Sequence, residues 1–127
     1  MSSTLFLRRV LALDSLSCLI MGIVMSLGAA VLAPLLGLPE PLVRIAGLLL
    51  LPLAAFIGWL ASRPAPPRFL VWLVIVGNLG WSAESFAIIA QQQPTPLGTF
   101  FVAAQAAAVL GLAALEYAEL KKARVTA

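Results

Sequence analysis

Four long apolar runs occupy most of this 127-residue chain. They are Leu11–Leu36, Leu42–Ala61, Phe69–Ala90 and Leu97–Leu115. A hydrocarbon core about 30 Å thick is crossed by roughly 20 apolar residues of helix. Each run is therefore long enough to span a bilayer, and together they leave no stretch for a soluble domain. The sequence predicts a single transmembrane domain over residues 1–127, in contact with membrane lipids.

The composition excludes several classes of function. Hydrophobic residues make up 62% of the chain and charged residues 10%, against about 45–50% and 25% in average soluble domains. The net charge of +3 comes from basic residues at the ends of the runs, which is typical of membrane topology and does not indicate a nucleic-acid partner. The chain has no histidine and one cysteine, so the usual metal ligands and the Ser–His and Cys–His pairs are missing. We expect no cofactor, no metal site and no enzymatic activity.

Proline-containing segments separate the runs. Pro41, Pro67 and Pro96 stand where the first turn of the next helix tolerates a residue without an N–H group. Thr95 is expected to cap the last helix. Because short connections join antiparallel neighbours, the sequence predicts an all-α, antiparallel four-helix transmembrane bundle. The expected helices cover approximately residues 5–36, 41–62, 67–91 and 96–121.

The first run has an alternative interpretation as a secretory signal peptide. Arg8 and Arg9 would form its basic region, Leu16–Leu27 its apolar region and Gly28–Ala30 its cleavage site. The apolar run, however, continues past that site to Leu36. We therefore expect an uncleaved transmembrane helix.

Basic residues are distributed unevenly between the two expected ends of the bundle. One end carries most of them, namely Arg8, Arg9, Arg63, Arg68, Lys121, Lys122 and Arg124. The opposite end carries only Arg44. By the positive-inside rule, both termini and the middle connection are expected in the cytoplasm.

Small residues recur at helical spacing in all four runs. The positions singled out are Cys18, Gly22, Ser26, Gly58, Gly77, Gly80 and Gly111. Small side chains at such spacing allow helix backbones to approach closely within lipid. We expect these residues to pack the helices of one molecule together, and a homo-oligomer interface is the alternative.

Asp14 lies near the start of the first run, about 8 Å along the helix from Arg9 at 1.5 Å per residue. One interpretation is a carboxylate at the cytoplasmic interface, paired with Arg9, Arg63, Arg68 or a C-terminal lysine. The other is a coupling acid for protons or cations, because acids inside a membrane are costly and often functional. The shallow position favours the first interpretation.

Glu84 lies deeper, roughly 9–15 Å along the helix from the connection at Pro94. Gln105 and Arg44 are expected at comparable depth on neighbouring helices, so the three side chains could meet in the outer half of the bundle. The alternative is local, because Glu40 and Arg44 have the favourable i, i+4 order and can pair with each other.

Asn78 and Trp81 are expected on one face of the third span. Asn78 lies near the middle of the membrane, where asparagine side chains often form hydrogen bonds between helices worth about 1 kcal/mol. We expect both residues to hold helices together, with a ligand contact as the alternative.

Several segments together carry a resemblance that extends over most of the chain. They are the entry Arg8–Asp14, the connection Arg63–Arg68, and the motifs Val76–Trp81, Thr95–Gly98 and Ala104–Ala106. In these segments the chain resembles small bacterial four-helix integral membrane proteins that have no established activity. The resemblance implies a cell inner-membrane location, and it implies neither an activity nor a cofactor.

The sequence leaves three functions open. We favour a non-enzymatic inner-membrane protein that packs as a homo-oligomer or as an accessory subunit of a membrane complex, because its motifs are packing motifs and its connections are short. The alternative is a small proton- or cation-coupled transporter or channel that uses Glu84 or Asp14. A second alternative is a lipid- or quinone-binding membrane protein, which requires an apolar groove between the helices.

Overall fold

The computed structural model describes residues 2–126, with side chains for residues 4–122. The described chain is all-α, and its helices are α1 (Ser2–Leu27), α2 (Ala29–Leu36), α3 (Glu40–Ser62), α4 (Arg68–Gln92) and α5 (Pro96–Thr126). All except α2 are long and apolar enough to cross a membrane. In each of these four, only 28% of the apolar window is buried inside the molecule, so most of its apolar surface is left for lipid. These features indicate a multi-pass membrane protein.

The proline positions locate the starts of the three later long helices. Pro41 is the second residue of α3, Pro67 immediately precedes α4, and Pro96 is the first residue of α5. The predicted cap at Thr95 is confirmed, because its Oγ1 accepts a hydrogen bond of 3.0 Å from the backbone N–H of Gly98. These helices therefore begin where an unpaired backbone donor is either absent or capped.

The first helix differs from the expectation of one helix over residues 5–36. It is interrupted at Gly28, which leaves α2 as a separate short helix. A continuous helix of that length would measure about 48 Å, well beyond a hydrocarbon core of about 30 Å. The short α2 ends at Leu36 and is followed by Gly37, which has a positive φ of 70°. The backbone N–H of Thr95 donates to Leu36 O at 3.1 Å. The residues beyond Gly28 thus cover the end of the molecule and do not extend α1.

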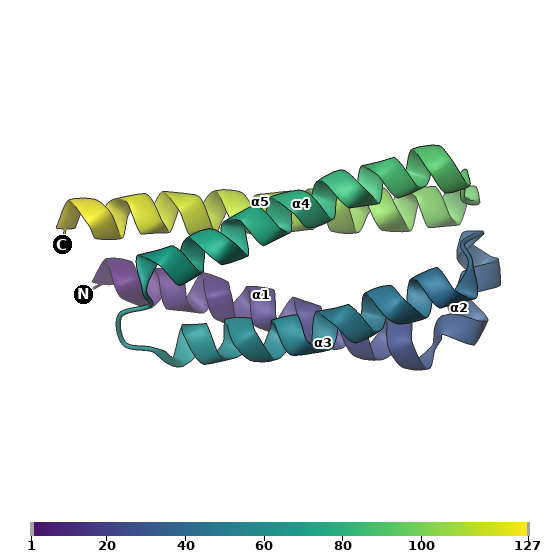
Figure 1. The fold of residues 1–127 in the computed structure, drawn as a ribbon. Coiled ribbons are helices and arrows are strands. Elements are labelled where there is room, and N and C mark those ends of the chain that lie inside the picture. The colour runs from purple at the N-terminus through teal and green to yellow at the C-terminus, as the bar shows by residue number, and fades with distance from the viewer. Residues whose placement is uncertain (1, 127) are drawn as a thin grey trace.

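The long helices form two pairs, α1 with α3 and α4 with α5 (Figure 1). The pairs meet mainly where α1 contacts α5, whereas α3 and α4 touch only sparsely. Both chain ends and the connection between α3 and α4 lie at one end of the molecule (Figure 1). The helix α2 and the connection between α4 and α5 lie at the other end.

The main hydrophobic core sits at the end where the chain termini lie. All four long helices contribute to it, through Leu7, Leu11, Ile57, Leu60, Val71, Val74, Ile75, Ala113 and Leu120. A second, smaller cluster near the opposite end consists of Ala29, Ala33 and Val43. The helices are thus joined tightly at one end, and the region between the two clusters is packed less completely.

The small residues divide into two groups. A Cβ added at Gly22 would lie 3.0 Å from the carbonyl oxygen of Gly47 on α3, and one added at Gly58 would lie 2.9 Å from Ser15 Oγ on α1. At these positions α1 and α3 approach closely. In contrast to the packing expectation, Gly77, Gly80 and Gly111 are exposed, and no atom lies within 4 Å of a Cβ added there.

The other two packing candidates lie on the α1–α3 side. The backbone N of Ser26 would be 2.5 Å from a Cβ added at Gly47, so Ser26 stands at the tight contact. Cys18 is partly buried and packs against the main core.

Candidate functional site

Asp14 is 1% exposed on α1 and lies at the centre of a buried polar cluster. The Nδ2 of Asn78 on α4 donates a hydrogen bond of 2.8 Å to Asp14 Oδ2. The thiol of Cys18, one turn along α1, lies 3.8 Å from Asp14 Oδ1 and donates to it. This placement differs from the expected interfacial ion pair, since Asp14 pairs with no arginine or lysine in the described part of the chain.

The nearby arginines bind backbone carbonyls. Arg8 Nε donates to Ala61 O at 2.9 Å, near the end of α3, and Arg68 Nη1 donates to Leu120 O at 3.2 Å on α5. Ala61 lies in the last turn of α3, where carbonyl groups carry partial negative charge and lack intrahelical partners. Both arginine side chains are thus engaged by backbone carbonyl groups, and neither pairs with Asp14.

Glu116 on α5 completes the cluster. The same Asn78 Nδ2 that donates to Asp14 also donates to Glu116 Oε1, at 3.0 Å. Glu116 is 0% exposed, and its Oε2 is buried without a hydrogen-bond partner. One amide thus bridges two buried acids on different helices, and one acceptor of the cluster remains unsatisfied. We name Asp14, Asn78 and Glu116 the acidic cluster.

The sequence analysis did not single out Glu116 as a site residue. It lies five residues before Lys121, which makes it look like part of the charged end of the helix. Side chains in helices lean toward the N-terminus, so Glu116 leans away from Lys121 and into the bundle. The sequence does contain a signal for their similar depth, because Asp14 lies five residues after Arg9 and Glu116 lies five residues before Lys121.

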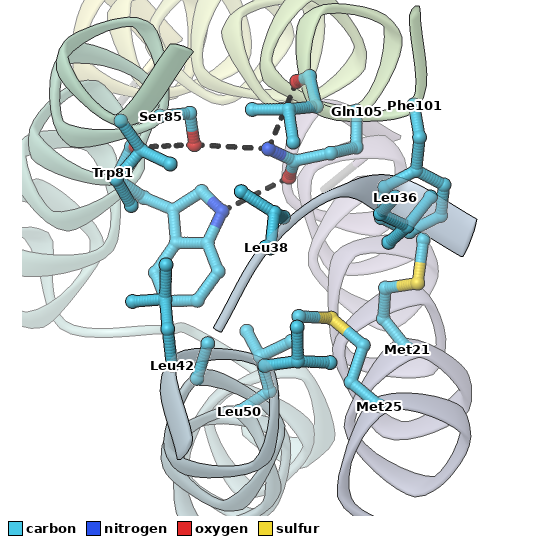
Figure 2. Close-up of a pocket in the computed structure, with 14 residues that line it drawn as sticks. Met21, Met25, Leu36, Leu38, Leu42, Leu50, Trp81, Ser85, Phe101 and Gln105 are labelled. Carbon is cyan, nitrogen blue, oxygen red and sulfur yellow. Dashed lines mark hydrogen bonds between the residues drawn. The ribbon is translucent and has the colours of Figure 1, made fainter. Parts of the chain in front are cut away.

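A second polar cluster connects α4 and α5. The indole Nε1 of Trp81 donates to Gln105 Oε1 at 2.9 Å, and Gln105 Nε2 donates to Ser85 Oγ at 2.9 Å. The Ser85 hydroxyl in turn donates to Trp81 O at 2.8 Å. Figure 2 shows these three side chains joined above a ring of leucine and methionine side chains. The amide, indole and hydroxyl groups are satisfied by one another, so this cluster fixes the spacing of the two helices.

The expected meeting of Glu84, Gln105 and Arg44 does not occur. Arg44 Nη1 pairs with Glu40 Oε2 at 2.7 Å, as in the local alternative. Gln105 is engaged by Trp81 and Ser85. Glu84 is exposed on α4, and it has no hydrogen-bond or ion-pair partner within the described region. The sequence pattern did not show that Glu84 points away from the other helices.

A large cavity of about 780 Å³ lies between the four long helices. Asp14 and Asn78 of the acidic cluster line it, and so do Trp81 and Gln105 of the second cluster. The remaining walls are almost entirely apolar and include Leu50, Phe56, Ile57, Val74, Phe100, Phe101, Val109 and Leu112. A smaller cavity of about 70 Å³ adjoins it beside α2 and is also lined by Trp81 and Gln105 (Figure 2). The volume of the large cavity lies in the range of about 300–1,000 Å³ that is typical of small-molecule sites.

The lining of the large cavity combines a few polar groups with extended apolar walls. Within residues 4–122, no group of three or more histidine, cysteine, aspartate or glutamate side chains could hold a metal ion. The polar groups of the lining include the carboxyl group of Asp14 and the amides of Asn78 and Gln105. Such walls bury an apolar molecule, and the few polar groups orient it.

Fold and cavity together define a helical, multi-pass membrane protein with a ligand-sized space between its long helices that is partly open to the outside, since the lining residue Phe100 is 72% exposed. No protein-family model matches the chain, and no curated protein and no solved structure is detectably similar to it.

Proposed function

We propose that this chain is a non-enzymatic integral membrane protein that binds one amphiphilic small molecule in the large cavity. The single observation that carries this proposal is the cavity itself, with apolar walls from four helices and two polar clusters at its surface. An apolar body would lie against the leucine and phenylalanine side chains. A polar end would meet Asp14 and Asn78, which are the buried hydrogen-bonding groups of the wall.

We further propose an antiparallel four-helix arrangement in a bacterial inner membrane, with both termini in the cytoplasm. The positive-inside rule supports this topology. Arg8, Arg63 and Arg68 belong to helix ends on the side where the two termini lie, whereas Arg44 belongs to the start of α3 on the other side (Figure 1). The sequence predicts that Arg124 also lies on the cytoplasmic side, but its side chain is outside the described residues.

Two glycines of α4 provide a matched test of ligand binding. Gly77 lines the large cavity, whereas Gly80 does not, and both have open space around an added Cβ. A phenylalanine at position 77 would occupy the cavity, and the same change at position 80 would add only surface. We expect native mass spectrometry of the gently extracted protein to detect one retained small molecule in wild type and Gly80→Phe, and none in Gly77→Phe. Equal retention by both variants would contradict the proposal.

A second candidate function is assembly, either with a second copy or as an accessory subunit. The observation that favours it is the outer face of α4, where Gly80 and Glu84 share one side of the helix by their spacing, are exposed and lie outside the cavity lining. A carboxyl group within a membrane-spanning helix is costly unless a partner or water satisfies it. A second helix packed against Gly80 would cover Glu84 and supply such a partner.

Assembly and ligand binding are separated by the same pair of variants. A phenylalanine at Gly80 would prevent close helix approach on the outer face without filling the cavity. We expect Gly80→Phe to reduce the oligomer measured by mass photometry in mild detergent while ligand retention persists. A wild-type protein that is monomeric under all gentle extraction conditions would exclude the homo-oligomer.

A coupling role for Asp14 in transport would require ligand binding as its first step, because Asp14 lines the cavity.

A further inference from the structure

The acidic cluster brings two buried carboxyl groups together without a basic side chain from the described residues. Asp14 and Glu116 are 1% and 0% exposed, and both accept from a single amide nitrogen of Asn78. The two carboxyl groups are therefore no farther apart than those two hydrogen bonds laid end to end. Neither acid forms an ion pair with an arginine or lysine of the described chain. A double negative charge at such close range is costly, and either a shared proton or a nearby positive charge relieves that cost.

An unsatisfied acceptor points to something that binds there. Glu116 Oε2 is fully buried and has no hydrogen-bond partner, although Oε1 of the same carboxyl group is held by Asn78. A buried acceptor of this kind is costly unless a donor reaches it or a positive charge lies nearby. The only sulfur contact to the cluster, from Cys18 to Asp14 Oδ1, is long at 3.8 Å, and a thiol is a weak donor. The cluster thus retains capacity to accept hydrogen bonds.

The large cavity borders this cluster. Asp14 and Asn78 belong to its lining, whereas Glu116 lies outside the lining and is linked to it through the amide of Asn78. Asp14 is 1% exposed, so a bound group reaches its carboxyl group through a small shift of the cavity wall. Phe56, Trp81 and Phe100 line the same cavity, and aromatic rings attract cations through their faces. A bare divalent ion is poorly suited, because such ions require six or more oxygen ligands and the wall is mostly apolar.

We propose that the molecule bound in the cavity carries a protonated amine, and that Asp14, supported by Asn78 and Glu116, accepts this ammonium group. This inference rests on the proposed ligand-binding function and specifies its ligand class as an organic amine with an apolar body. The ammonium N–H groups would donate to Asp14, and the positive charge would offset both acids. The apolar body would extend along the cavity toward Trp81 and Gln105.

Dodecylamine and 1-dodecanol form a matched pair of probes, because they have the same alkyl chain and differ in the charged head group. Binding of each radiolabelled probe is measured to the purified full-length protein in detergent micelles, with protein-free micelles as the background. We expect wild type to bind the amine at least about tenfold more tightly than the alcohol, since one hydrogen bond to a charged group is worth that factor or more. Asp14→Asn should abolish the preference for the amine over the alcohol.

Two further variants keep the test decisive if Asp14→Asn unfolds the protein. Glu116→Gln preserves the shape of the side chain and removes the second acid, so it should reduce the preference for the amine. Glu84→Gln removes an exposed acid outside the cavity and should change nothing. Equal binding of the two probes to wild type would overturn the ammonium assignment while the cavity site stands. Failure of wild type and Gly77→Phe alike to bind either probe would overturn the proposed function itself.

Discussion

Replacing Gly47 with alanine tests the close contact between α1 and α3. A Cβ at this position would lie 2.5 Å from the backbone N of Ser26 and 2.8 Å from Met25 Cβ on α1. Favourable carbon contacts have separations of about 3.5–4.0 Å. The two nearest atoms belong to backbone or to a Cβ, so they cannot rotate away as the end of a flexible side chain does. The methyl group must therefore push α1 and α3 apart, across the most extensive helix interface.

The expected cost follows from two opposing effects. Forcing one methyl group into a fully packed contact costs about 1–3 kcal/mol. Alanine in place of glycine within a helix returns about 0.5–1 kcal/mol. Gly111→Ala is the matched control, because Gly111 lies inside α5 and has no atom within 4 Å of an added Cβ. The helix-propensity gain is common to both variants, so Gly47→Ala should be less stable than Gly111→Ala by about 1–3 kcal/mol.

The measurement is equilibrium unfolding of the purified protein in mixed micelles, with increasing SDS and far-UV circular dichroism as the readout. Wild type, Gly47→Ala and Gly111→Ala are compared under identical conditions. We expect Gly111→Ala to unfold at or above the wild-type SDS fraction and Gly47→Ala clearly below it. Equal midpoints for the two variants would refute the close contact between α1 and α3 at this level.

Three further predictions use the same unfolding assay. Asn78→Leu should destabilise the protein by about 2–5 kcal/mol, because it leaves two buried acids without their shared donor; a loss below the experimental error would show that the acids do not depend on this amide. Gln105→Leu should cost only about 1.2 kcal/mol, because it removes two hydrogen bonds between α4 and α5 and each such bond between membrane helices is worth about 0.6 kcal/mol; a loss as large as that of Asn78→Leu would contradict the different roles assigned to the two clusters. Thr95→Ala removes the cap of α5 and the hydrogen bond to Leu35 O, so it should cost about 1 kcal/mol, whereas Thr99→Ala, one turn later, should have little effect.

The long helices were predictable because they depend on local properties of the sequence. Apolar length determines whether a segment can cross a membrane, and proline marks where a helix begins. The break at Gly28 was missed because Gly28–Ala30 and the residues around it are all small or apolar, so hydropathy does not change there. The length of the run nevertheless contained a hint, since a 32-residue helix exceeds the bilayer thickness.

Which side of each helix faces the interior was much harder to predict. In a soluble protein the polar residues mark the outer face, but in these helices both faces are apolar. The glycines illustrate the difficulty, because Gly22 lies at a tight helix contact and Gly77 lies in open space, although both are small residues in apolar surroundings. Glu84 also escaped prediction, since its sequence neighbours do not reveal that it points outward.

The acidic cluster depends on three helices at once, which explains why only parts of it were visible in the sequence. Asp14 and Asn78 are conspicuous as single polar residues within apolar runs, whereas Glu116 is obscured by the charged end of α5. Their meeting requires that one amide supply both of its N–H groups to acids 64 and 38 residues away in the chain. The spacing of residues along the sequence does not predict contacts over such separations. Burying two acids is costly, and this cost distinguishes the cluster from ordinary apolar packing. In the proposed complex, an ammonium group bound in the cavity beside Asp14 offsets part of that cost.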